Sequence, residues 1–181
     1  MRKFSGSIFL TFALWPAIAS AAPQGLYGKS ITVSWNETRS QRDGQAGAFR
    51  QVSIPYVQTY YISSQGRVFV RSQAKGGSGA NFGTVDSVGH DAPKGFVDAR
   101  NMTFKSNGMV ITTAFGGAGR HIDVSFDGGF AGCSAHVVTA MQSGAKTAVV
   151  RSISTGGNVE FESVSAGAAS CSIANGNAFA Q

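Results

Sequence analysis

The sequence predicts an all-β protein, a single-domain antiparallel meander that closes into a small β-barrel. Between residues 102 and 139, four runs alternate apolar with polar residues, and turn sequences such as Asn107-Gly108 and Asp127-Gly128 separate them. Such pairs favour tight hairpins, because these turns need positive φ angles. Leu26 is the only leucine after residue 21, so valine, isoleucine and phenylalanine, which suit a pleated sheet, supply the apolar side chains. A two-sheet β-sandwich is the alternative arrangement of the same strands.

Further strands are expected on both sides of this meander. In the first of them, Ile31, Val33 and Trp35 share a face opposite serine and threonine residues. The polar, glycine-containing residues 39–50 predict a loop or one short helical turn. Pro55 indicates a sheet edge or a bulge, because its nitrogen cannot donate a hydrogen bond. The expected strands are residues 27–36, 52–62, 67–72, 146–153, 159–164 and 169–174.

Residues 73–95 predict a long glycine-rich loop. A glycine cluster opens the segment, and Val85 and Val88 could form a weak strand further along it. The loop lacks the pattern G-x-x-x-x-G-K-[ST] and no helical pattern follows, which argues against a phosphate-binding loop. Connections of this length in compact domains are usually functional or disordered, so the loop is a candidate to close over a ligand.

Residues 1–21 predict a secretory signal peptide. Arg2 and Lys3 supply the positive start, and an apolar segment too short to span a bilayer follows. Ala19-Ser20-Ala21 fits a cleavage site. Residues 22–181 are then long enough for one domain with its own core. We therefore expect a periplasmic or secreted protein with no transmembrane segment after residue 21.

The two cysteines of the chain, Cys133 and Cys171, are expected to form a disulfide. An exported chain meets oxidising conditions, and one pair of cysteines has a single intramolecular connectivity. A loop of this length would stabilise the fold by about 4 kcal/mol by the chain-entropy argument. The strand that carries Cys171 should therefore lie beside the strand of Cys133 or face it across the core.

The sequence contains no recognisable catalytic motif. His121 and Asp123 lie two residues apart on one face of an expected strand, which makes them weak candidates for a metal or an acid–base pair. A polar outer face is the simpler interpretation, because apolar residues alternate with them. The patterns G-x-S-x-G and H-E-x-x-H are both missing. We therefore expect neither catalytic residues nor a cofactor.

The first third of the domain combines aromatic and basic residues. The whole chain carries a net charge of +6, and the excess lies mostly before residue 76. Nucleic acid is an improbable partner for an exported protein without a nucleic-acid-binding motif. An apolar wall with a cationic rim suits an amphipathic anion. The candidate ligand-binding residues are Trp35, Tyr56, Tyr60, Phe69, Arg67 and Arg71.

These observations favour a non-enzymatic binding protein for a small apolar, amphipathic or anionic ligand, or for a component of the cell envelope. Each feature also has a simpler explanation, because the aromatic residues could pack a core and the cations could be merely solvated. A structural or interaction protein of the envelope without a small ligand is therefore the alternative. A hydrolase with an unrecognised site is the third hypothesis.

Overall fold

The computed structural model describes residues 21–44, 47–75, 81–88, 102–151 and 157–179, and it confirms the all-β class. Apart from the short 3-10 helix η1 (Gln24–Leu26), every described element is a strand. Two antiparallel sheets form, one with the order β4-β3-β2-β1-β10-β9 and one with the order β5-β6-β7-β8. The strands are β1 (Lys29–Asp43), β2 (Arg50–Ile62), β3 (Val68–Lys75), β4 (Asn81–Val88), β5 (Met102–Lys105), β6 (Gly108–Phe115), β7 (Ala118–Phe126), β8 (Cys133–Met141), β9 (Ala148–Arg151) and β10 (Asn158–Asn175).

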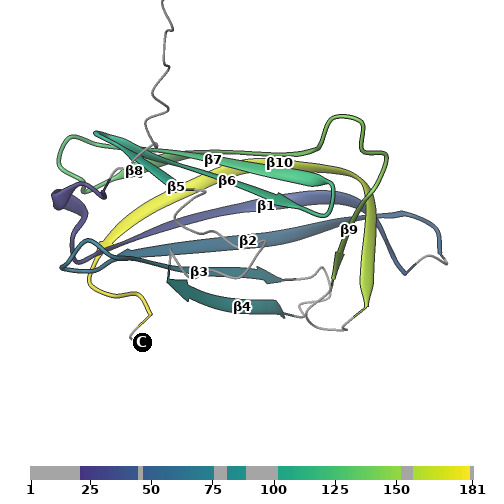
Figure 1. Cartoon of the computed structure of the whole chain (residues 1–181), viewed down its shortest axis with the longest axis horizontal. Helices are drawn as coiled ribbons and strands as arrows, with labels where there is room; N and C mark the ends of the chain where they lie inside the picture. Colours follow the sequence, from purple (N-terminus) through teal and green to yellow (C-terminus); the bar gives the residue numbers. More distant parts are fainter. Residues whose placement is uncertain (1–20, 45–46, 76–80, 89–101, 152–156, 180–181) are drawn as a thin grey trace, which may run out of the picture.

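The two sheets share one hydrophobic core. Figure 1 shows β5 to β8 as a layer across β10 and β1. Ile31 and Val33 of β1 pack in the same buried cluster as Ile111 of β6 and Val124 of β7. Because these side chains alternate with exposed or half-buried ones, each sheet turns one face toward the other.

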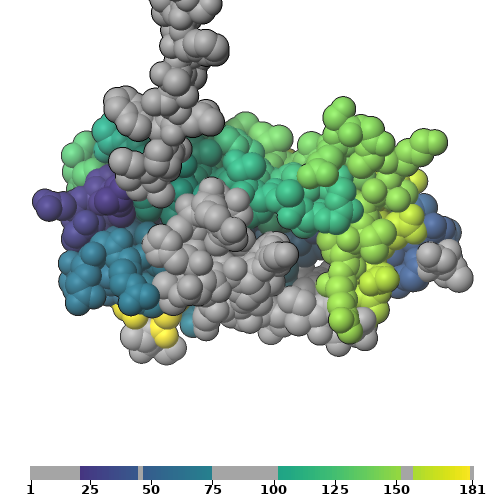
Figure 2. Space-filling model, in the orientation of Figure 1, coloured from purple at the N-terminus to yellow at the C-terminus, as the bar shows by residue number. Residues whose placement is uncertain are grey.

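The predicted closure into a barrel is not seen in the part of the chain that the structure describes, because no strand ladder joins the two sheets there. One backbone hydrogen bond does connect them, from Val149 N of β9 to Gly116 O in the β6–β7 turn, at 2.8 Å. Figure 2 shows the green segment around β9 beside this teal hairpin. Gly116 has a φ of +57°, and a Cβ there would lie 1.9 Å from Val149 O, so this approach requires glycine.

The four-stranded sheet is the meander that the sequence predicted. Each strand from β5 to β8 pairs with the next in antiparallel register. The turn after β7 is held by Asp127, whose Oδ1 accepts hydrogen bonds from Gly129 N and Ala131 N. The local turn signals were therefore sufficient to define this sheet.

The prediction of a loop over residues 39–50 was wrong at both ends, because β1 continues to Asp43 and β2 begins at Arg50. The inward face of β1 simply changes from apolar to polar side chains, which bond to one another inside the domain. The expectation of two strands at residues 159–164 and 169–174 was also wrong, because both belong to the single strand β10, which pairs with β1 along most of its length with two register shifts. Pro55 does lie at an edge position, since β3 pairs with β2 only from Tyr56 onward.

The loop predicted at residues 73–95 contains a strand. β3 runs to Lys75, and β4 covers Asn81–Val88 and pairs with β3. The candidate strand around Val85 and Val88 is therefore present and gives the larger sheet its edge. Residues 76–80 and 89–101, to which the rest of the loop prediction applies, lie outside the described residues.

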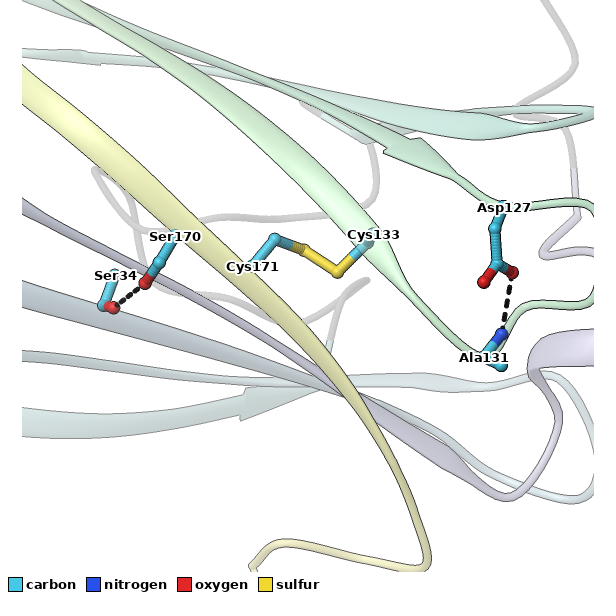
Figure 3. Close-up of a disulfide and its surroundings, with 6 residues drawn as sticks. All are labelled: Ser34, Asp127, Ala131, Cys133, Ser170 and Cys171. Atoms are coloured by element: carbon cyan, nitrogen blue, oxygen red, sulfur yellow. Dashed lines mark hydrogen bonds between the residues drawn. A yellow bond between two sulfur atoms is a disulfide. The ribbon is translucent and has the colours of Figure 1, made fainter.

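The predicted disulfide is confirmed. Cys133 of β8 and Cys171 of β10 are bonded, with their Cα atoms 5.5 Å apart (Figure 3). Because β8 and β10 belong to different sheets, the bond ties the two sheets together. Within the described ranges, no helix is long and apolar enough to cross a bilayer.

Candidate functional site

The six candidate ligand-binding residues lie on both faces of the larger sheet. Trp35 of β1 and Tyr56 and Tyr60 of β2 point inward, toward the four-stranded sheet. Phe69 lies on the outer face, since its neighbour Val70 is the buried residue of β3. Arg67 and Arg71 lie with Phe69 on that outer face. The structure therefore divides the set into an inner group and an outer group.

The outer group belongs to a continuous aromatic surface. The rings of Tyr61 and Phe69 lie 6.0 Å apart across β2 and β3, and the Phe179 ring meets Tyr61 edge-on at 6.4 Å. The Arg71 guanidinium lies 4.6 Å from the centre of the Phe179 ring, and that of Arg67 lies 5.8 Å from Phe69. We call these five residues the outer patch. Three aromatic rings and two cations thus meet on the outer side of the larger sheet.

The C-terminal segment completes the outer patch by folding back onto the sheet. Ser30 Oγ donates a hydrogen bond to Gly176 O at 2.7 Å and accepts one from Ala178 N at 3.0 Å. Asn177 Oδ1 accepts a hydrogen bond from Phe179 N, which fixes the last described turn. Ser30 is consequently buried although it faces outward. Sequence analysis missed Phe179, and the only available signal was a single phenylalanine in an otherwise small, polar tail.

The inner group packs the core around a charged side chain. Trp35 and Tyr56 stack with ring centres 5.3 Å apart, and the Arg120 guanidinium lies 4.5 Å from the centre of Tyr56. Tyr60 is fully buried and donates a hydrogen bond to Gln58 Oε1. Burial raises the pKa of the Tyr60 hydroxyl, so this residue stays neutral and acts as a core hydrogen-bond donor.

A buried ion cluster, formed by Glu37, Arg39, Arg120 and Thr139, lies next to these rings. Glu37 Oε1 accepts a hydrogen bond from Arg39 Nε at 2.7 Å, and Oε2 accepts one from Arg120 Nη2 at 2.6 Å. Thr139 Oγ1 donates to Oε2 at 3.1 Å. The cluster joins β1 of the larger sheet to β7 and β8 of the smaller one. Sequence analysis missed it, although Trp35, Glu37 and Arg39 continue one alternating face.

The charges in this cluster hold one another in the ionised state. Burial alone would raise the pKa of the Glu37 carboxyl, but the charges of Arg120 and Arg39 and their hydrogen bonds outweigh burial and lower it. Burial opposes the charge of Arg120, but Glu37 outweighs that effect and raises the Arg120 pKa. Glu37 and Arg120 are therefore both charged at neutral pH.

The weak metal candidates lie elsewhere, on the outer face of the four-stranded sheet. His121 is exposed, and its Nδ1 lies 3.2 Å from Thr112 Oγ1. Asp123 of β7 stands opposite His136 of β8 in the strand register. Among the described residues, no group of three or more histidine, cysteine or acidic side chains could hold a metal ion. Asp123 and His121 thus form part of a polar outer face.

Comparisons with known proteins leave the candidate site to be judged on its own geometry. No protein-family model matches this chain, and neither a curated protein nor a solved structure is detectably similar to it.

Proposed function

We propose that this protein is an exported, non-enzymatic binding protein whose outer patch binds a small amphipathic acid. In this proposal, residues 22–181 form one domain, and the two sheets pack as a β-sandwich whose larger sheet presents the binding face. The disulfide between Cys133 and Cys171 is compatible with export to an oxidising compartment. A sheet bonded to a second sheet by a disulfide is a rigid support for such a face.

The observation that carries this proposal is the stacking of arginine on aromatic rings at the outer surface. Tyr61, Phe69 and Phe179 offer apolar area, and Arg67 and Arg71 stand over two of these rings. Guanidinium groups bind carboxylates with two parallel hydrogen bonds, and rings beneath them hold them in place. An acid with an apolar body matches both parts of the surface.

The alternative is a structural protein of the cell envelope that binds no small ligand. The buried positions of Trp35 and Tyr60 favour it, because those rings fill the core. In that case the outer patch would serve only to anchor the C-terminal segment. The two functions differ in one respect that can be measured, since only a binding protein requires the outer patch to bind a carboxylate.

Calorimetric titration with a long-chain carboxylate and its methyl ester tests the proposal. We expect the acid to bind and the ester, which lacks the charge, to bind at least tenfold more weakly. Replacing both outer arginines, Arg67→Gln with Arg71→Gln, should remove most of the affinity for the acid. The matched control is Lys105→Gln with Lys146→Gln, which makes the same charge change at exposed positions away from the outer patch. Equal affinity in the two double variants, or no heat with any acid, would rule the proposal out.

A further inference from the structure

The interior of the domain has an apolar half and a polar half. The polar half contains more positive than negative charge. Along the inward face of β1, Ile31 and Val33 give way to Glu37, Arg39 and Gln41, all buried. Glu37, Arg39 and Arg120 are the only buried charged side chains in the part of the chain that the structure describes. One carboxylate faces two guanidinium groups, so the buried ion cluster has a net charge of +1.

Other acids near this end of β1 already have partners. Glu160 pairs with Arg42 at 2.7 Å, and Asp43 pairs with Arg50 at the same distance. Both pairs are more exposed than the buried ion cluster, and each is neutral by itself. No further carboxylate among the described residues therefore balances the second guanidinium. A buried charge without a counter-charge is strongly unfavourable, which makes this a place where an anion would be stabilised.

Two buried donors in this region lack hydrogen-bond partners among the described residues. They are Trp35 Nε1 and Arg120 Nε, on side chains that are 4 % and 8 % exposed. The Arg120 guanidinium carbon lies 5.0 Å from the centre of the Trp35 ring, so both donors belong to one neighbourhood. Buried donors normally bond to an acceptor. A positive charge beside two unused N–H groups is the arrangement that an anion requires.

We propose that the polar half of the interior binds one small monovalent anion of the halide class, with Trp35 Nε1 and Arg120 Nε as donors. The charge of the ion would balance the net +1 of the buried ion cluster. Trp35, Tyr56 and Phe115 lie within 5.0 Å of the Arg120 guanidinium, measured from the ring centres to its carbon. These rings enclose the cation, so a monatomic ion fits better than sulfate or a ligand carboxylate. This site is separate from the outer patch, and the two proposals stand or fall independently.

Tryptophan fluorescence offers a direct test, because the chain has two tryptophans and Trp15→Phe leaves Trp35 as the only reporter. Bromide quenches an indole that it contacts, whereas a 4 % exposed ring is shielded from random collisions in solution. We expect bromide to quench Trp35 with a saturating curve, and chloride at constant ionic strength to reverse the quenching. The neutral quencher acrylamide should have little effect. A linear bromide curve that chloride does not reverse would contradict the proposal.

Crystals of the unmodified protein soaked in bromide give the decisive result. We expect one anomalous peak within hydrogen-bond distance of both Trp35 Nε1 and Arg120 Nε. Arg120→Lys, which keeps the charge but removes Nε, should abolish the saturating quench in the Trp15→Phe protein. Lys105→Gln, an exposed charge change in β5, is the matched control and should leave the quench unchanged. If Arg120→Lys does not fold, the soak alone decides. Density for water, or no anomalous peak between these donors, would overturn the proposal.

Discussion

Replacing Glu37 by glutamine should destabilise the fold more than any other single charge removal among the described residues. The substitution keeps the shape of the side chain but removes the only carboxylate that is buried among the residues whose burial the structure describes. It leaves Arg39 and Arg120 buried without a counter-charge and weakens three hydrogen bonds of 2.6 to 3.1 Å. Removing one partner of a buried ion pair typically costs about 3–5 kcal/mol. That is a large part of the roughly 5–15 kcal/mol by which a domain is stable.

Equilibrium unfolding in urea, followed by circular dichroism, measures this loss. Glu162→Gln is the matched control, because Glu162 lies in β10 with its carboxylate exposed and bonds only to Ser40 among the described residues. We expect the control to change the free energy of unfolding by less than about 0.5 kcal/mol. A free energy for Glu37→Gln within about 1 kcal/mol of the unmodified protein would refute the assignment of an ion cluster that is buried and essential.

A triple variant tests whether Glu37→Gln is destabilising because it leaves Arg39 and Arg120 buried without a counter-charge. In Glu37→Leu with Arg39→Met and Arg120→Met, the whole charged group is replaced by apolar side chains. Such replacements are often neutral or stabilising, because no unpaired charge stays buried. We expect the triple variant to be more stable than Glu37→Gln alone. If it is less stable, the cluster contributes to the fold through its hydrogen bonds rather than through its charge balance.

Three further predictions concern pH, the disulfide and one glycine. The pKa of Glu37 in the folded protein is lowered from 4.5, so its contribution to the free energy of unfolding is complete above pH about 4.5 and is lost as the pH falls through the folded pKa. Urea unfolding below pH about 4.5 should show this loss of stability, and the Glu37→Gln variant should not show it. Cys133→Ser with Cys171→Ser should lower the free energy of unfolding by about 2–5 kcal/mol in urea, and a smaller loss would show that the bond adds little. Gly116→Ala should lower the melting temperature, since its Cβ would lie 1.9 Å from Val149 O, whereas Gly128→Ala, with nothing within 4 Å, should leave it nearly unchanged. Equal melting temperatures for the two glycine variants would show that the β6–β7 turn does not approach β9 closely.

The sequence predicted best what depends on neighbouring residues. The meander from β5 to β8 follows from alternation and from turns such as Asn107-Gly108, and each of its strands pairs with the next. The disulfide followed from there being one pair of cysteines and one expected compartment. The edge position of Pro55 followed from its missing donor.

What the sequence could not supply depends on contacts between distant residues. Residues 39–43 were expected in a loop because they are polar. Arg39 is buried because it bonds to Glu37, which also accepts hydrogen bonds from Arg120 and Thr139 of the other sheet. Tyr60 and Tyr61 are adjacent in one strand and therefore point to opposite faces. Alternation could not show that Phe69 aligns with Tyr61, because the register between strands was unknown. The outer patch therefore needed the structure, and so did the contribution of Phe179.

The most direct test of the proposed function locates the ligand on the protein. Nuclear magnetic resonance spectra of isotope-labelled protein, recorded during titration with a long-chain carboxylate, report which amide signals move. Binding at the outer patch predicts saturating shifts for Tyr61, Phe69 and Phe179 and their neighbours, with no change around His121 on the other sheet. Shifts confined to any other face, or no shifts at saturating acid, would contradict the account.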